Sequence, residues 1–171
     1  VIACDQGNAY AQIGHRSLGA LASSLSGDIA IASAGGLSLL GGDGPQASAQ
    51  IGHGGIGATL TTLGGAIDVS VATDLDLIGG IAAGASAQIG HGGLFTTAAI
   101  EGDVEVAAGG SIALRSLAPA QSAYAKIGHG DDARGAVAAL GGGGTRDGDL
   151  LVTSGADIAM ENAMIGHRNS L

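Results

Sequence analysis

Pairs of aliphatic residues, each pair split by one small or polar residue, recur along the chain at fixed intervals. In the segment "GDIAIASAGGLSL" the pairs are Ile29 with Ile31 and Leu37 with Leu39, so the internal steps are 2, 6 and 2 residues. A step of two places both side chains on one face of a β-strand. The segment therefore predicts two short strands joined by a turn. Three later segments repeat these steps, starting at Ile67, Val104 and Leu150.

A second pattern, the tripeptide Ile-Gly-His, returns every 38 residues. It is clearest in the octapeptide "SAQIGHGG", which occupies residues 48–55 and recurs unchanged at residues 86–93. The residues before the motif glycine alternate as a strand would, which predicts a third strand in each repeat. An internal period of this length is typical of repeat architectures. The motif histidines are His15, His53, His91, His129 and His167.

Together the two patterns predict an all-β fold, a parallel right-handed β-helix solenoid with about 38 residues and three short strands per coil. Equivalent residues of successive coils would then stack about 4.8 Å apart, the spacing of hydrogen-bonded strands. An α-helical solenoid is the rival for such a period, but pairs at i and i+2 flanked by Gly-Asp and Gly-Gly favour strands. The expected inward ladders consist of Ile13, Ile51, Ile89, Ile127 and Ile165; Ile29, Ile67, Val104 and Leu150; and Leu37, Leu75, Ile112 and Ile158.

The repeats predict one domain, a single β-helix segment over residues 1–171 with internal repeats at 16–53, 54–91, 92–129 and 130–167. The last repeat differs because 23 residues separate Ile127 from Leu150, whereas 15 or 16 separate the equivalent positions elsewhere. We expect an enlarged corner loop there. Natural solenoids end in atypical capping repeats, so the segment is interpreted as a window from a longer chain or as a subunit that stacks end to end.

Composition limits the width of the core and the classes of partner. The chain has 34 glycines, one Phe, two Tyr and no Trp, so the wide aromatic core of an ordinary domain is excluded and a narrow interior is expected. A net charge of −9 repels phosphate backbones and anionic headgroups, which disfavours nucleic acid as a partner. Glycine and polar residues interrupt every apolar run, so membrane insertion is not expected.

The histidine column has two interpretations. In the structural one, the imidazoles stand at a corner and hydrogen-bond to a carbonyl or to one another, because buried polar groups must be paired. Alternation would then turn the motif glycines outward, together with Gln12, Gln50, Gln88, Lys126 and Met164. The alternative is metal or haem binding by His15, His53, His91, His129 and His167, since imidazole is the commonest transition-metal ligand. A straight column offers one nitrogen per level, however, whereas zinc needs four converging ligands.

Carboxylates align as well. Asp28, Asp103 and Asp149 precede the first strand of their repeats, and Asp68 and Glu105 should be neighbours on adjacent coils. Calcium could bridge such oxygens, although a solvated acidic face is the simpler interpretation. We expect no cofactor, with calcium or a transition metal as the alternative. No catalytic set is evident; a polysaccharide-acting β-helix enzyme would need Asp68, Asp76, Glu101 and Glu105 to meet across a groove.

The repeats "GDIAIASAGGLSL" followed by "AQIGHGG" resemble the shaft of filamentous-haemagglutinin-like large bacterial exoproteins, adhesins secreted by two-partner or autotransporter routes. The resemblance covers all four full repeats and the partial first one. The departures from the pattern are Ala66, Lys126, Met164, Arg16 and Arg168.

This resemblance implies a right-handed β-helix at the bacterial cell surface, extracellular, with a structural or adhesive role in a surface fibre or biofilm matrix. It implies no enzymatic activity. The implied partners are further coils of the same chain or end-to-end copies of it, and a host or matrix surface, including glycans.

Overall fold

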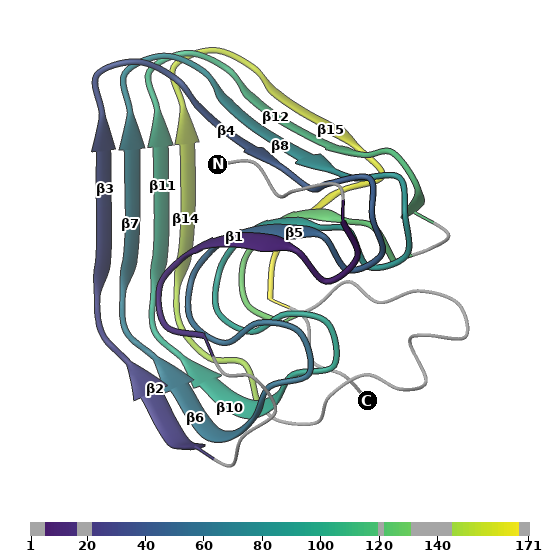
Figure 1. The fold of residues 1–171 in the computed structure, drawn as a ribbon. Helices are drawn as coiled ribbons and strands as arrows, with labels where there is room; N and C mark the ends of the chain where they lie inside the picture. The colour runs from purple at the N-terminus through teal and green to yellow at the C-terminus, as the bar shows by residue number, and fades with distance from the viewer. Residues whose placement is uncertain (1–5, 17–21, 120–121, 131–144, 168–171) are drawn as a thin grey trace.

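The computed structural model describes residues 6–16, 22–119, 122–130 and 145–167. The chain winds as a parallel β-solenoid of about 4 turns with ~38 residues per coil (Figure 1). Every described strand pairs in parallel with the equivalent strand of a neighbouring coil. The predicted all-β solenoid is therefore confirmed.

In the described part of the chain four sheets run along the solenoid; three are named here by their position in Figure 1 and one by the Ile-Gly-His motif. The motif sheet contains β1 (Tyr10–Ile13), β5 (Ser48–Ile51), β9 (Ala87–Ile89), β13 (Ala125–Ile127) and β16 (Met164–Ile165). The lower sheet contains β2 (Ala22–Ser26), β6 (Thr59–Gly64) and β10 (Thr97–Glu101). The side sheet contains β3 (Ile29–Ser33), β7 (Ile67–Val71), β11 (Val104–Ala108) and β14 (Leu150–Ser154). The upper sheet contains β4 (Leu37–Leu40), β8 (Leu75–Gly79), β12 (Ile112–Ser116) and β15 (Ile158–Glu161).

The lower sheet corrects the expectation of three strands per coil, because the repeats 16–53, 54–91 and 92–129 each carry four. In β6 the buried leucines are Leu60 and Leu63, three residues apart, and the register of β10 shifts between Thr97 and Ala99. Such an irregularity breaks the period of two by which a strand is recognised in sequence. The lower sheet has its own small apolar cluster, made of Ala58, Leu60, Leu63, Ala98 and Ile100.

The side and upper sheets follow the alternation in the sequence. In β7 the side chains of Ile67, Val69 and Val71 are buried, while Asp68 and Ser70 are exposed. Successive side chains of a pleated strand point to opposite faces, so the residues next to an exposed one point into the core. The aliphatic pairs of the sequence thus define which face of the side and upper sheets meets the interior.

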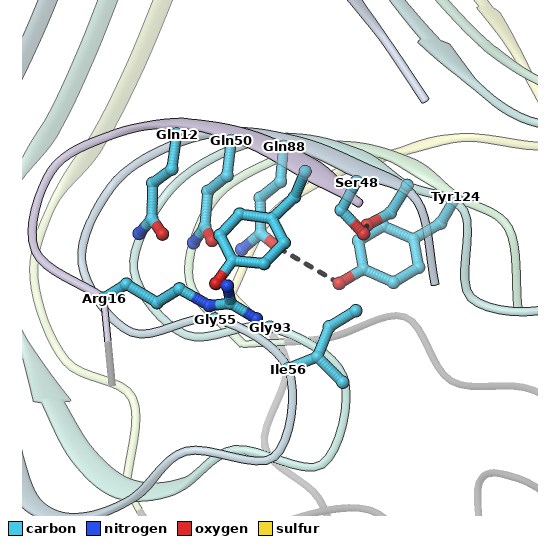
Figure 2. A pocket seen from close by; sticks show the side chains of 11 residues that line it. Gln12, Arg16, Ser48, Gln50, Gly55, Ile56, Gln88, Gly93 and Tyr124 are labelled. Carbon is cyan, nitrogen blue, oxygen red and sulfur yellow. Dashed lines mark hydrogen bonds between the residues drawn. The ribbon is translucent and has the colours of Figure 1, made fainter. Parts of the chain in front are cut away.

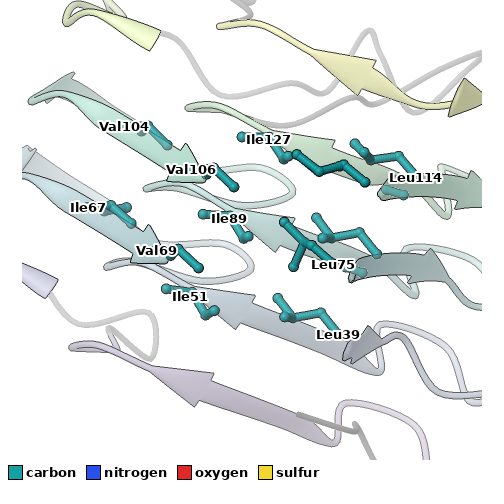
Figure 3. Close-up of a cluster of buried hydrophobic side chains, with 14 of the residues drawn as sticks. Leu39, Ile51, Ile67, Val69, Leu75, Ile89, Val104, Val106, Leu114 and Ile127 are labelled. Carbon is teal, nitrogen blue, oxygen red and sulfur yellow. The ribbon is translucent and has the colours of Figure 1, made fainter. Parts of the chain in front are cut away.

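The main core consists of the aliphatic ladders (Figure 3). Ile51 and Ile89 are 0% exposed, and burial of such a side chain stabilises the fold by about 1.5–3 kcal/mol. Ladder residues of the outermost coils are less covered, because an outermost coil has a neighbour on one side only. Ile13 is 40% exposed and Ile158 is 45% exposed. The registers align Ile13, Ile51, Ile89, Ile127 and Ile165; Ile29, Ile67, Val104 and Leu150; and Leu37, Leu75, Ile112 and Ile158.

The enlarged loop expected between Ile127 and Leu150 falls largely on residues 131–144, which lie outside the described residues. Among the residues that are described, no helix has the length and apolar character needed to cross a bilayer.

Candidate functional site: the histidine column and the second interior

The five motif histidines form one stacked column at the corner that follows the motif sheet. Successive ring centroids lie 4.7, 4.9, 4.9 and 4.6 Å apart, and the planes differ by 7–16°. His53, His91 and His129 are almost completely buried. Each of these three imidazoles is therefore in contact with its counterparts above and below.

In four of the stacked imidazoles, those of His53, His91, His129 and His167, both ring nitrogens bind the main chain. Nδ1 of His91 accepts the backbone N–H of His53 at 2.9 Å, and Nδ1 of His129 accepts that of His91 at 3.0 Å. On the other side of the ring, Nε2 of His91 lies 2.9 Å from the carbonyl oxygen of Gly65. The predicted carbonyl partner is therefore present, but the second contact runs from ring to backbone and not from ring to ring. The other Nε2 contacts are His53 to Gly27, His129 to Gly102 and His167 to Gly148, at 2.7, 2.7 and 3.1 Å.

These contacts fix the tautomer. A backbone N–H can only donate, so Nδ1 must be unprotonated, and Nε2 must carry the proton that it donates to the glycine carbonyl. Burial lowers the pKa of His91 to about 4 and that of His129 to about 3, against the partial compensation of the carbonyl bonds. Burial likewise lowers the pKa of His53 and His167. These four imidazoles are neutral at pH 7.

This geometry does not favour the metal or haem alternative. A metal ligand must offer a lone pair, and in His53, His91 and His129 the lone pair of Nδ1 is occupied by a backbone N–H. Among the residues that the structure describes, no group of three or more His, Cys, Asp or Glu side chains is placed to hold a metal ion.

The motif glycines permit the coils to approach. Gly52 and Gly90 have φ values of 148° and 149°, where a side chain is strained. A Cβ on Gly52 would lie 2.1 Å from the carbonyl oxygen of Gly90, and a Cβ on Gly90 would lie 2.1 Å from that of Gly128. The expectation that these glycines face outward is wrong, because the missing side chain would point at the next coil.

Alternation also places the glutamines outward, and the structure corrects this expectation. Gln50 and Gln88 are 7% and 2% exposed, and Lys126 in the same column is 0% exposed. They line what we call the second interior, the space on the face of the motif sheet opposite the aliphatic core (Figure 2). The loops after His53 and His91 return across this face, where Gly55, Ile56 and Gly93 lie opposite the glutamines. Strands β5, β9 and β13 are buried on both sides.

Each buried amide in this interior binds main-chain carbonyls of the next coil. Gln88 Nε2 donates to the carbonyls of Gly128 and Gly130 at 3.1 and 2.9 Å, and Gln50 Nε2 donates to those of Gly90 and Gly92. Lys126 replaces the amide with an ammonium that donates to the carbonyl of His129 at 2.6 Å. The "AQIGHGG" motif is thus a bonding unit, in which glutamine and histidine each tie one coil to the next.

A column of Tyr10, Ser48, Ser86 and Tyr124 borders the second interior (Figure 2). Tyr124 donates its hydroxyl to Gln88 Oε1 at 3.1 Å, whereas the shorter serines leave a chamber between the two tyrosines. The cavity volume of the chamber is about 20 Å³. Sites for small organic ligands are ~300–1,000 Å³, so in this conformation the chamber is no site for such a ligand.

The carboxylates are spread over the outside. Asp68 and Glu105 are exposed neighbours in adjacent strands, as predicted. Asp28 Oδ1 accepts the backbone N–H of Ala66 at 2.9 Å, and Asp103 Oδ1 accepts that of Asp149 at 2.8 Å. The four candidates for a polysaccharide-cleaving site lie on three different sheets, in strands β7 (Asp68), β8 (Asp76), β10 (Glu101) and β11 (Glu105).

Comparison with known proteins gives no relative. No family model matches the chain, and neither a curated protein nor a solved structure does.

Proposed function

We propose that this chain is part of the structural and adhesive shaft of a secreted bacterial surface fibre or matrix adhesin. The observation that carries the proposal is the coil-to-coil register, which is the same from coil to coil in the motif, side and upper sheets. A solenoid of this kind grows in length by adding coils while its cross-section stays constant. The sequence resemblance to filamentous-haemagglutinin-like shafts supports the same function.

The bonding in each coil also supports a load-bearing role. Besides the strand ladders, the histidine and glutamine columns add side-chain bonds between successive coils at the same corner. The proposed partners are further coils of the same chain or end-to-end copies, and a host or matrix surface, including its glycans. The proposed location is the outside of the bacterial cell.

The alternatives receive less support. Metal or haem capture requires imidazole lone pairs that the backbone occupies. An enzyme acting on polysaccharide requires acids that converge, and Asp76 and Glu105 lie on different sheets.

Antibodies raised against residues 1–171 test the proposal on intact and permeabilised cells of the source bacterium. We expect gold label on intact cells, along thin fibres that extend from the surface. Label that appears only after permeabilisation would contradict it. Beads coated with the chain test the adhesive part, by retention on host-cell or matrix surfaces relative to albumin-coated beads.

A further inference from the structure

The histidine column joins two parts of each coil that are otherwise held by separate sheets. Each ring follows a motif strand, yet in four of them the Nε2 proton binds the carbonyl of a glycine that precedes a strand of the side sheet, as His91 does with Gly65 before β7. Its Nδ1 meanwhile binds the previous coil. The imidazole therefore fastens the motif sheet to the side sheet and one coil to the next.

A second proton has no acceptor in this arrangement. Protonated Nδ1 of His91 would point its N–H at the backbone N–H of His53, so one hydrogen bond would be lost and two donors would face each other. The new charge would also lie under 5 Å from the rings of its two neighbours. Protonation is thus compatible only with a corner that has opened to water.

Within the described part of the chain, the charged groups near the column do little to make protonation of the closed column easier. On the motif strands, Lys126 donates to the carbonyl of His129, and its positive charge further lowers the pKa of His129. On the side-sheet corner, Asp147 raises the pKa of His167 only in part, against the larger effect of burial. At the same corner the carboxylates of Asp28 and Asp103 bind backbone N–H groups of the next coil. Arg16, beside His15, lies over the ring of Tyr10.

We propose that the histidine column is an acid-sensitive latch, which holds the corner between the motif and side sheets closed at neutral pH and releases it in mild acid. The buried ladder residues of the described side and upper sheets are aliphatic and do not titrate, so these ladders stay closed over the same range. This inference does not depend on the fibre function.

The direction of the pH effect on opening follows from proton linkage. In the open form the imidazoles titrate at their ordinary pKa near 6.5, while in the closed form burial holds the pKa of His91 at about 4 and that of His129 at about 3. Above pH ~6.5 both forms are neutral and the latch is complete. As the pH falls from 6.5 toward 4, the open form binds protons that the closed form cannot, and the opening constant rises about tenfold per pH unit for each proton bound. Stacked imidazoles repel one another when charged, so they open as a coupled group.

Hydrogen exchange of individual backbone amides between pH 7.5 and 4.5, corrected for the intrinsic exchange rate, tests the latch. We expect the amides of His53 and His91, which donate to Nδ1 groups, to lose protection by at least about tenfold per pH unit below pH 6.5. The amides of β7 and β11 should keep theirs. Unchanged protection of the two histidine amides, or an equal loss in β7 and β11, would refute the latch.

Two variants identify the groups responsible. In His91→Asn with His129→Asn, the side-chain carbonyl still accepts hydrogen bonds but does not titrate, so the pH slope of protection at the His53 amide should fall to less than half. The slope is compared with the variant's own value at pH 7.5, which separates it from a general loss of stability. Asp103→Asn is the matched control and should keep the slope of the unmodified chain. A full slope in the double variant, or its loss in Asp103→Asn, would assign the effect to other groups and overturn the proposal.

Discussion

Ile51 of β5 and Ile89 of β9 are Cα partners in a parallel ladder, and both side chains are completely buried. They are 38 residues apart in the sequence, one coil of the solenoid. Val69 and Val106 are likewise Cα partners in the side sheet, 37 residues apart. The core is therefore a set of columns in which like residues pack on like.

Replacement of Ile89 by Asp tests this core. The variant buries an unpaired carboxylate between Ile51 and Ile127, so the free energy of unfolding should fall by more than about 4 kcal/mol. Ala83→Asp, in an exposed loop, is the control and should change it by less than about 0.5 kcal/mol. Urea unfolding followed by circular dichroism measures both. Equal midpoints would show that Ile89 does not face the core.

Replacement of Gly90 by Ala tests the approach of the coils. The new Cβ would meet the carbonyl of Gly128 at 2.1 Å, and φ of 149° strains any side chain. We expect a loss of at least about 2 kcal/mol in the free energy of unfolding. Gly35→Ala has no atom within 4 Å of the new Cβ and should leave the melting temperature almost unchanged. A Gly90→Ala protein as stable as Gly35→Ala would contradict the coil spacing.

Replacement of Gln88 by Leu tests the second interior. It removes the donors to two buried carbonyls and the acceptor of the Tyr124 hydroxyl, which should cost about 3 kcal/mol. Gln12→Leu, in the half-buried first coil, is the comparison and should cost less than about 1 kcal/mol. If both glutamines face solvent, the two variants will unfold at the same denaturant concentration.

Replacement of Arg146 by Met tests the edge of the lower sheet. Within the described residues β10 is the last strand of its sheet, and beyond it a single parallel bridge joins Ile100 to Arg146. The Arg146 guanidinium donates to the carbonyls of Ala98 and Thr96 at 2.8 and 3.5 Å. Without the guanidinium these carbonyls lose this donor, and carbonyls at the edge of a sheet can pair with another chain. Light scattering at raised protein concentration should show association of Arg146→Met. Arg115→Met, on the outer face of β12, should stay as dispersed as the unmodified chain.

The regular part of the fold was accessible from sequence because its pattern is redundant. Steps of two, such as Ile67 to Val69 and Leu75 to Leu77, recur in every repeat. The strands of the side and upper sheets lie at the positions that these steps predict. The lower sheet was missed because Leu60 and Leu63 are three residues apart, which no period of two detects. Its strands depend on the neighbouring coils more than on their own alternation.

The candidate site was predicted in part. A histidine after a glycine at a fixed period indicated a corner column with a carbonyl partner, which the structure contains. Alternation alone places Gln50 and Gln88 in solvent, because it identifies the two faces of a strand but does not say what covers the second one. The return of the loop across that face is a tertiary feature. The repeated "GHGG" was its one local sign, since Gly92 and its equivalents admit a tight reversal.

Nuclear Overhauser contacts between isoleucine methyl groups test the central claim most directly. In a chain labelled only at isoleucine methyls, strong contacts are predicted between Ile51 and Ile89 and between Ile89 and Ile127, because each pair occupies adjacent levels of one ladder. Absence of both contacts in a folded sample would contradict the superposition of the 38-residue coils and, with it, the proposed shaft.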